Sequence, residues 1–288
     1  MDSTPQAEFA RDLTGTLLRL RSGRLRTHVP QPGELRVRRP GAKFHATPEL
    51  FIQTGGATDF SCPADAFRLG TSDVCVIPRG VAHAEIPQDL RTPYGVLVCM
   101  HTRDGLFLHR GRADPAHRIR GYGTTLLPGL RARDSLRYLD EIAAHETVSK
   151  AQRRRYVAAL LEAFFLTVLS ELERPSAVPA ADSSPLVIAT ENLVRTHFPD
   201  VTLTVARLAR ELGCSADHLS RHFHRERGLT LTAWITRERL TTAKEMLADP
   251  SYNIAEVGWA CGFSGSSYFI RVFSAHNGIT PRAYRLNL

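Results

Sequence analysis

The first half of the chain, from about Leu35 to His109, consists of short stretches in which apolar and polar residues alternate. These stretches are ELRVR, LFIQTGG, AFRLG, VCVIPRG, YGVLVCMHT and LFLHR, and Gly and Pro stand between them. A period of two is typical of strands with one buried face, and Gly and Pro are typical of the turns that join such strands. The pattern predicts an antiparallel β-barrel or sandwich.

From about Asp134 the apolar residues follow a helical period. The segment RRRYVAALLEAFFLTVLSELER places five of them on one stripe: Val157, Leu161, Phe164, Val168 and Leu172. Tyr156, Leu160 and Phe165 make this stripe wider than a half-solvated helix usually carries. Two interpretations stay open, a helix buried against the barrel and a helix that also packs on a second subunit.

A segment rich in Pro, Ala and Ser, PSAVPAADSSP, occupies residues 175–185. It has little to bury, which is typical of a linker between domains. With 288 residues, the chain also exceeds the usual size of one compact domain. We therefore predict a first domain at residues 1–174, a linker at 175–185 and a helical domain at 186–288.

Within the helical half, one arrangement of residues occurs twice. In the first copy an amphipathic helix stops at Gly213, Ser215 can cap the next helix, and Leu219 and Phe223 lie on the inward side of that helix. The small residue Ala209, four positions before the glycine, lets the two helices cross closely. Such a crossing is the physical requirement of a helix-turn-helix motif.

The second copy is GWACGFSGSSYFIRVF, 49 residues further on when the turn glycines at 213 and 262 are aligned. Gly258 takes the place of the small residue, Gly262 that of the turn glycine and Ser264 that of the cap. Tyr268 and Val272 are then predicted on the inward side of the last helix. Two such motifs in one basic chain are a much stronger signal than one.

The outward sides of the two second helices carry small polar residues and arginines. A helix that enters the major groove of DNA must be slim at its N-terminal end, and an arginine one turn later can reach a guanine edge or a phosphate. The residues predicted to face DNA are Asp217, His218, Ser220, Arg221, Arg225, Ser266, Ser267, Ile270 and Arg271.

Between the two motifs, TLTAWITRERLTTAKEMLADP predicts one long helix. Its apolar positions are Trp234, Ile235, Leu240, Ala243 and Leu247. Successive major grooves on one face of DNA lie about 34 Å apart, so a rigid spacer between two motifs has an evident purpose.

The stretch RERLTTAKEMLADPSYNIAEVGWACGFSGSSYFIRVFSAHNGITPRAYR resembles the DNA-binding domain of the AraC-type bacterial transcription regulators. The resemblance covers about Val187 to Arg285. It implies a DNA reader with two motifs, usually joined to a ligand-sensing or dimerising domain. By position it assigns base-facing roles to Asp217, Ser220, Arg221, Ser266, Ser267 and Arg271. The acid at Asp217 departs from a basic pattern and could accept a hydrogen bond from cytosine or be a poor contact.

Residues 45–56 and 73–83 resemble, more loosely, the two motifs of a cupin barrel, a common sensor domain in AraC-type regulators. In metal-binding cupins these motifs supply three histidines and a glutamate. Here His45, Glu49 and His83 match, and Lys43 stands where the other histidine belongs. Three such ligands could hold a divalent metal. They could equally be hydrogen-bonded barrel residues or contact an organic effector, and a lysine beside an ion favours these alternatives.

We therefore expect no metal and no cofactor, and a small-molecule effector inside the barrel. The residues predicted to contact the effector are His45, Glu49, Phe51, Gln53, Cys75, His83 and Tyr94.

Charge and cysteine usage narrow the class of protein. The net charge of +8 favours anionic partners, nucleic acid first among them. The five cysteines are scattered and form no C-x-x-C pair, which fits reduced thiols in a cytoplasm. The chain has no apolar run near the roughly 18 residues of a membrane span, and its start lacks the apolar core of a secretory signal.

Together these features predict an α+β protein of more than one domain, with a cupin-like antiparallel β-barrel, dimerisation helices near residues 134–173 and an all-α tandem helix-turn-helix domain. The predicted function is sequence-specific transcription regulation in the cytoplasm. The predicted partners are double-stranded promoter DNA, a small-molecule effector, a second copy of the chain, and RNA polymerase if the protein is an activator. The alternative is a metal-dependent cupin enzyme with a regulatory DNA-binding domain, which Lys43 counts against.

Overall fold

The chain divides into two compact units, Met1–Ala177 and Val178–Leu288, and each is described by itself. The structure, a computed structural model, describes residues 5–31, 45, 47–90, 93–102, 105–113, 119–144, 149–174, 184–250 and 252–288. The strand predicted at ELRVR, the Lys43 position and residues 175–183 of the predicted linker lie outside these ranges. The domain boundaries inferred from the sequence therefore stay a prediction.

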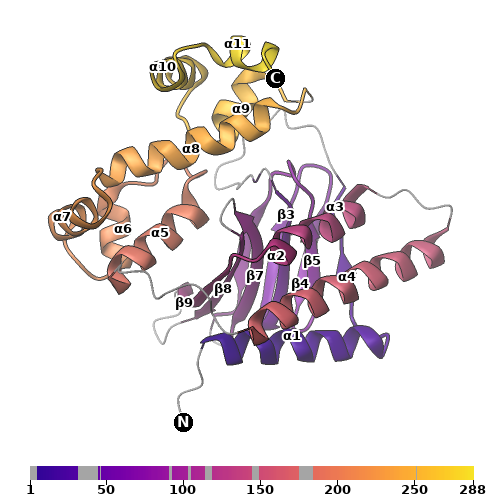
Figure 1. The fold of residues 1–288 in the computed structure, drawn as a ribbon. Coiled ribbons are helices and arrows are strands. Elements are labelled where there is room, and N and C mark those ends of the chain that lie inside the picture. The colour runs from indigo at the N-terminus through magenta and orange to yellow at the C-terminus, as the bar shows by residue number, and fades with distance from the viewer. Residues whose placement is uncertain are drawn as a thin grey trace. The chain divides into compact units, whose positions relative to one another are not determined.

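The first unit begins and ends with helices and has strands between them. Its elements are α1 Pro5–Arg21, β1 Thr27–His28, β2 Glu49–Gly55, β3 Ala57–Ser61, β4 Ala66–Gly70, β5 Val74–Ile77, β6 Ala84–Gln88, β7 Gly95–Thr102, β8 Gly105–Ala113, β9 Ile119–Leu127, α2 Leu130–Asp134, α3 Leu136–Ala144 and α4 Lys150–Glu173 (Figure 1). The strands form a six-stranded sheet in the order β1-β5-β2-β7-β8-β9 and a three-stranded sheet in the order β4-β3-β6. All neighbours are antiparallel except β1 and β5.

Over the described residues the two sheets are open, and the closed barrel expected from the sequence is not formed. The chain passes from one sheet to the other between β2 and β3. There Gly56 has a φ of +69°, and a Cβ atom on Gly55 would lie 2.7 Å from the carbonyl oxygen of Pro93. This tight, glycine-dependent bend separates β2 from β3, so no ladder of hydrogen bonds joins the two sheets at this point.

Alternate residues of the central strands face opposite sides of the six-stranded sheet. Leu50 and Ile52 of β2 belong to the core beneath the helices, whereas Phe51 between them belongs to the core against the three-stranded sheet. Val74 and Cys75 of β5 divide in the same way. The period of two read from the sequence therefore separates two cores.

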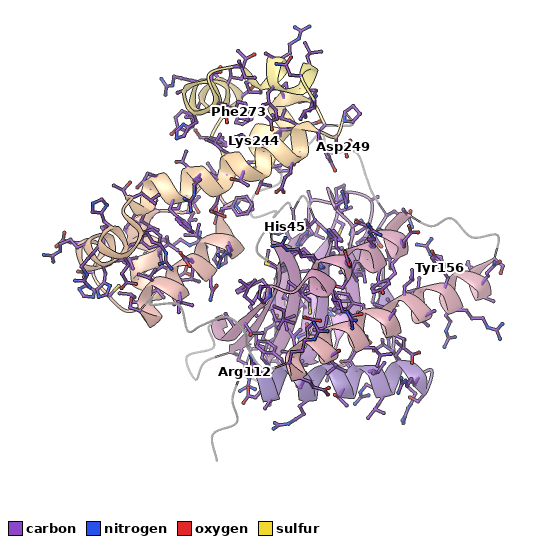
Figure 2. The ribbon with its side chains drawn as sticks, viewed as in Figure 1. His45, Arg112, Tyr156, Lys244, Asp249 and Phe273 are labelled. Atoms are coloured by element: carbon purple, nitrogen blue, oxygen red, sulfur yellow. The ribbon has the colours of Figure 1, made fainter. Side chains whose placement is uncertain are left out.

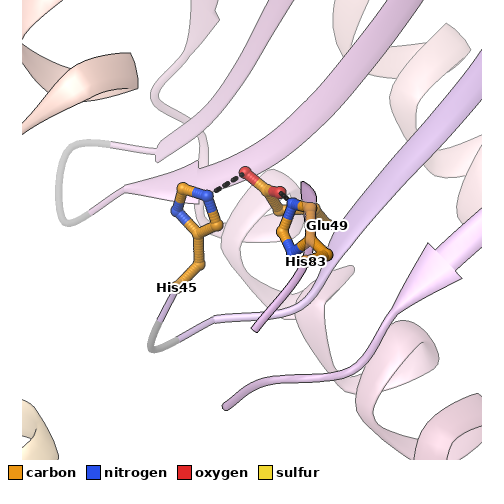
Figure 3. A group of neighbouring side chains, drawn as sticks. All are labelled: His45, Glu49 and His83. Carbon is orange, nitrogen blue, oxygen red and sulfur yellow. Dashed lines mark ion pairs between the residues drawn. The ribbon is translucent and has the colours of Figure 1, made fainter. Parts of the chain in front are cut away.

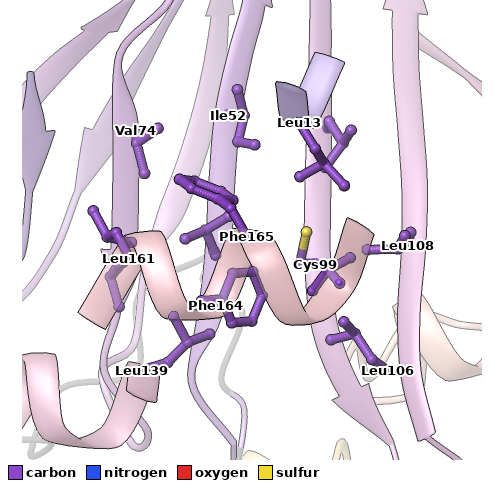
Figure 4. Close-up of a cluster of buried hydrophobic side chains, with 14 of the residues drawn as sticks. Leu13, Ile52, Val74, Cys99, Leu106, Leu108, Leu139, Leu161, Phe164 and Phe165 are labelled. Carbon is purple, nitrogen blue, oxygen red and sulfur yellow. The ribbon is translucent and has the colours of Figure 1, made fainter. Parts of the chain in front are cut away.

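Helices α1 and α4 cover one face of the six-stranded sheet (Figure 1). In Figure 4, Phe164 and Phe165 of α4 lie against the strands that carry Ile52 and Cys99. The stripe predicted on α4 is buried as expected, and these buried residues are Val157, Leu161, Phe164, Phe165, Val168 and Leu172. Packing of α4 on a second subunit stays a prediction.

The sequence did not predict α1, which packs Phe9, Leu13 and Leu17 into the same core. Arg110 of β8, nearly buried, makes ion pairs with Glu8 and with Asp12, one helical turn apart on α1 (Arg110 Nη2 to Asp12 Oδ2, 2.6 Å). Burial raises the pKa of Asp12 although the guanidinium of Arg110 opposes this shift. An apolar stripe and a buried charged contact thus both attach α1 to the sheet.

The second unit contains only helices over its described residues. They are α5 Pro185–His197, α6 Val205–Glu211, α7 Ala216–Arg227, α8 Leu231–Leu247, α9 Ile254–Ala260, α10 Ser266–Asn277 and α11 Pro281–Leu286. The long helix α8 runs between two groups, α5–α7 at one end and α9–α11 at the other (Figure 1). The apolar residues predicted on α8 are all buried: Trp234, Ile235, Leu240, Ala243 and Leu247.

Candidate nucleic-acid interface

The first helix-turn-helix motif, α6 and α7, is built as the sequence predicts. Gly213 ends the first helix with a φ of +71°, and the hydroxyl of Ser215 accepts a hydrogen bond from the backbone N–H of His218 at 3.2 Å. Leu219 and Phe223 are fully buried against α5, α6 and α8. A left-handed Gly228 ends α7. The turn glycine, the cap and the core residues of this motif are therefore the ones that the sequence predicts.

The second motif, α9 and α10, corrects the prediction in two places. Its buried residues are Phe269 and Phe273, not Tyr268 and Val272, and Tyr268 is 43% exposed. Figure 2 labels Phe273 on α10. The N-cap of α10 is Gly265 and not Ser264, and no side chain caps this end.

One extra residue in the second turn explains both errors. Two steps separate the turn glycine from the cap in the first motif, from 213 to 215, and three in the second, from 262 to 265. In the longer turn Phe263 is buried, and its ring centroid lies 5.0 Å from that of Phe269. The offset between the motifs is therefore 49 residues up to the turn and 50 after it.

A small residue permits the close helix crossing in the second motif, as the sequence suggested. A Cβ atom on Gly258 would lie 2.8–2.9 Å from the side chain of Phe269. In the first motif the equivalent pair is Ala209 and Leu219, both buried in one cluster. The smaller leucine leaves space for the alanine methyl group, whereas the phenylalanine ring requires glycine.

Hydrogen bonds join α8 to the loop after α5, and the second turn packs closely against the same loop. Arg239 of α8, mostly buried, donates from Nε to the carbonyl oxygen of Phe198 and from Nη2 to that of Asp200, both at 2.9 Å. A Cβ atom on Gly262 would lie 2.3 Å from the same Phe198 oxygen. We call Arg239, Gly262 and Phe198 the clamp, because together they fix the second motif relative to the first.

We call α7 and α10 the reading helices. Most of the residues predicted to face DNA are exposed on them, while Ser220 and Ser266 are half-buried. The hydroxyl of Ser220 is used within α7, where it donates to the carbonyl oxygen of Ala216 at 2.7 Å. With the offset of 50, Ile270 is the equivalent of Ser220, and Arg271 that of Arg221.

The exposed arginines of the two reading helices have different neighbours. Arg221 pairs with Asp217, with 2.8 Å between Nη2 and Oδ2. Arg271 stacks over the ring of Tyr268, with its guanidinium carbon 5.4 Å from the ring centroid. Arg225 donates to Nε2 of His222 at 2.9 Å. Tyr268 is the residue on this surface that the sequence missed, since the uncorrected offset put it in the core.

The first unit brings five of the seven residues predicted for an effector into one region between its sheets. His45, Glu49 and His83 converge (Figure 3), all buried, with 3.4 Å from His45 Nε2 to Glu49 Oε1 and 3.5 Å from His83 Nε2 to Glu49 Oε2. The ring of Phe51 lies edge-on to that of His83, 5.9 Å between centroids. Cys75 belongs to the same apolar cluster as Phe51.

Gln53 and Tyr94, the other two predicted residues, form a separate hydrogen-bonded group with Thr58. The hydroxyl of Thr58 donates to Gln53 Oε1 at 2.8 Å and is also 2.8 Å from the hydroxyl of Tyr94. Gln53 Nε2 donates to the carbonyl oxygens of Gly55 and Gly95. These contacts connect β2, β3 and the start of β7, which is a structural role that the sequence did not reveal.

The buried carboxylate and histidines adjust one another's protonation. Burial alone would lower the pKa of His83, but hydrogen bonds to the carboxylates of Glu49 and Glu85 raise it to about 9. Burial raises the pKa of Glu49, whereas His45 and His83 lower it, and the net direction is downward. At neutral pH the cluster therefore holds an ionised Glu49 beside a protonated His83.

The same three residues have the donor types for a divalent cation. One ligand atom from each of His45, Glu49 and His83 lies within 4.8 Å of the others. Two imidazoles and a carboxylate suit a first-row divalent metal, but a metal would have to displace the proton on His83. The cluster can equally hold a polar group of an organic molecule.

Comparison with known proteins bears on the second unit. Residues 208–287 match the helix-turn-helix domain family. The regulatory protein PocR of Salmonella typhimurium is 33% identical over 92 residues, which cover 32% of this chain and 30% of PocR. Residues 208–287 form an AraC-type helix-turn-helix domain. The xylose operon regulatory protein of Escherichia coli is 26% identical over 169 residues, which cover 54% of this chain and 43% of that protein.

The C-terminal domain of AraT, a response regulator from Geobacillus stearothermophilus, is a solved structure with 28% identity. The match covers 38% of this chain and 89% of that one, with a TM-score of 0.37. This chain spans less than half the length of PocR and of the xylose operon regulatory protein. The likeness therefore concerns only a part of each of these two proteins. These relatives are regulators, and the comparisons give no support to the enzyme alternative. Among the described residues, no helix has the length and apolar character needed to cross a membrane.

Proposed function

We propose that the protein is a sequence-specific DNA-binding transcription regulator whose helices α7 and α10 enter two consecutive segments of the major groove. The observation that carries this proposal is the pair of reading helices, each with an exposed arginine at the equivalent position, Arg221 and Arg271. A helix in this setting reads bases with the side chains of its first turns. The clamp keeps the two helices at one separation, as reading of two grooves requires.

Charge and homology support the same function. The net charge of +8 supplies the long-range attraction to a polyanion. The relatives that share the AraC-type domain are regulatory proteins of operons. The protein would then act in the cytoplasm, and contact RNA polymerase if it activates transcription.

We propose that residues 1–174 are a cupin-like sensor that binds a small molecule between its sheets, followed by a linker at 175–185 and the DNA-binding domain at 186–288. His45, Glu49, Phe51, Cys75 and His83 would line the effector site, and Gln53 and Tyr94 would hold the sheets around it. Buried polar groups inside an apolar cluster are typical of a ligand site. Effector binding would change the placement of the two DNA-binding domains of a dimer.

The helices α3 and α4 would form the dimer contact. Leu166 on α4 is 46% exposed. Tyr156 and Leu160 on the same helix are half-buried. A second copy that packs against α4 would cover these side chains. The test is the molecular mass of the full chain in solution, compared with that of Leu166→Arg.

The test of DNA reading is the selection of binding sites by the full chain from a random duplex pool at physiological salt. We expect a motif of two parts about one helical turn apart. Arg221→Ala and Arg271→Ala should each cost about 1–3 kcal/mol on the selected site and relax the preference at one position. The control is Arg68→Ala in the first unit, where Arg68 pairs with Asp59.

Two outcomes would count against this function. A pool without sequence enrichment, even for residues 184–288 alone, would leave only a basic surface that binds any DNA. An equal loss on selected and random DNA would reassign the arginine concerned to a phosphate.

The effector site has its own test. A compound that raises the melting temperature of the full chain should lose affinity in Glu49→Gln, measured by titration calorimetry. Unchanged affinity in a folded Glu49→Gln protein would place the compound elsewhere. Glu162→Gln is the matched control, because it removes a carboxylate of the same unit that pairs with Arg21 outside this cluster.

A further inference from the structure

The exposed face of α7 carries an ion pair for which α10 has no equivalent. Arg221 and Asp217 lie one helical turn apart, with 2.8 Å between Nη2 and Oδ2, and their side chains are 75% and 76% exposed. With the offset of 50, the equivalent of Asp217 is Ser267, and Arg271 instead stacks over Tyr268. The acid is therefore specific to the first motif.

A carboxylate on the face that is proposed to enter DNA weakens binding unless it makes a favourable contact there. A carboxylate is repelled by the phosphates on both sides of the major groove. Paired with Arg221, it removes the net charge of the arginine and so weakens the attraction of this side chain to phosphate. The pair is thus poorly suited to a backbone contact and better suited to a base edge.

The geometry of the guanidinium points to the base concerned. Arginine has five N–H donors in one plane, and Asp217 engages the Nη2 end. A guanidinium held on one edge by a carboxylate keeps its plane fixed and its other donors available. Guanine offers two acceptors side by side, O6 and N7, which match such a planar donor pair.

We infer that Asp217 is a specificity-determining residue that orients Arg221 toward a guanine, so that α7 selects a G·C pair at one fixed position of the binding site. This inference rests on the proposed function, because it assumes that α7 enters the major groove. Asp217 acts through Arg221 and is a positioning residue. In α10, where Ser267 replaces the acid, Arg271 contacts its target with less preference among bases.

The experiment measures the affinity of the full chain for the selected site and for all single-base variants of it, at two salt concentrations. The variants are Asp217→Asn, Arg221→Lys and Ser267→Asp. Asp59→Asn is the matched control, because Asp59 also pairs with an arginine (Asp59 Oδ1 to Arg68 Nε, 2.7 Å) and its loss changes the net charge equally. Circular dichroism checks that each variant is folded.

We expect Asp217→Asn to reduce the preference for guanine at one position by roughly three- to tenfold and to leave the other positions unchanged. Arg221→Lys should reduce the preference at the same position, since lysine lacks the planar donor pair. Ser267→Asp should strengthen the preference at the position that Arg271 contacts. Asp59→Asn should change no preference.

The inference is overturned if Asp217→Asn raises or lowers the affinity by one factor for every sequence, or changes nothing. The acid would then act only on charge or on helix stability. A wild-type protein without preference at any position would contradict the proposed function itself. That result is distinct from a sequence-specific protein in which Asp217 has no effect.

Discussion

In the first helix-turn-helix motif the turn ends at a serine whose side chain caps the next helix. In the second, the turn contains a buried phenylalanine and ends at a glycine, which has no side chain to cap the helix. In the first, Ser215 follows the turn glycine after two steps and caps α7. In the second, Phe263 occupies the turn and Gly265, three steps after the turn glycine, is the N-cap of α10. Both turns nevertheless place an arginine at the same point of the exposed face. The comparison shows that the position of the exposed arginine repeats while the support beneath it differs.

The difference in support should be largest at the turn glycines. Gly213 and Gly262 both have a positive φ, but a Cβ atom would meet nothing within 4 Å at Gly213 and the Phe198 carbonyl oxygen at 2.3 Å at Gly262. We expect Gly213→Ala to cost about 1–2 kcal/mol from the left-handed conformation alone. Gly262→Ala should cost about 2–5 kcal/mol, because overpacking adds to this.

Tryptophan fluorescence during chemical denaturation measures this free energy of unfolding, since both tryptophans, Trp234 and Trp259, lie in the second unit. Equal losses for the two glycine variants would mean that the contact with Phe198 is not rigid.

The helix crossing should give the next largest effect. Gly258→Ala places a methyl group within 2.8–2.9 Å of the Phe269 side chain, so we expect a loss of about 1–3 kcal/mol. Adding Phe269→Leu recreates the pair of the first motif, alanine against leucine, and should recover part of that loss. A double-mutant cycle with both single variants measures the coupling. Additive losses would show that the two side chains do not compete for the same space.

Substitutions at the two predicted cap serines should change the free energy of unfolding by a smaller amount. Ser215→Ala removes the hydrogen bond that the His218 N–H donates to the Ser215 hydroxyl and should cost about 1 kcal/mol. The control is Ser264→Ala, because Ser264 is exposed and caps no helix in the structure. The midpoint of urea unfolding should therefore move for the first variant and stay for the second. A similar shift for both would restore Ser264 as the cap predicted from the sequence.

The smallest expected effect is a gain in the stability of the protein. Gly265, the N-cap of α10, has an extended backbone, and a Cβ atom on it would meet nothing within 4 Å. Gly265→Ser would supply the missing cap and stabilise the protein by a few tenths of a kcal/mol, on the order of the difference between glycine and serine caps. Hydrogen exchange at the first amides of α10 measures this gain directly. Unchanged or faster exchange would show that the serine does not reach them.

Features that depend on period and residue size were predictable from the sequence. The stripes on α4 and α8 and the small residue at Gly258 follow from local patterns, and the structure has them. The grouping of His45, Glu49 and His83 followed instead from the resemblance to a cupin, and the structure brings these three residues together. The sequence could not show that the second turn holds one more residue, because Tyr268 and Phe269 are both large and aromatic. Only the packing against α9 decides which of them is buried.

Long-range features were not predictable. The α1 contact with Arg110 joins residues about a hundred positions apart, and its acids looked like surface charges. The bend at Gly56 that separates the sheets depends on Pro93 and Tyr94, far along the chain. The proposed roles of the exposed residues of α7 and α10 toward DNA stay predictions until the binding experiments are done.

The clamp has a consequence for the promoters that such a protein can use. Each base pair added between the DNA segment read by α7 and the segment read by α10 turns the second segment by about 34–36° around the DNA axis and moves it by about 3.4 Å. Arg239 of α8 donates to the Phe198 carbonyl oxygen and the turn at Gly262 packs against the same oxygen, so these contacts hold the two motifs in one relative placement and oppose that rotation. Functional promoters should therefore have the same number of base pairs between the segment read by α7 and the segment read by α10. A genome search can treat that number as a constant.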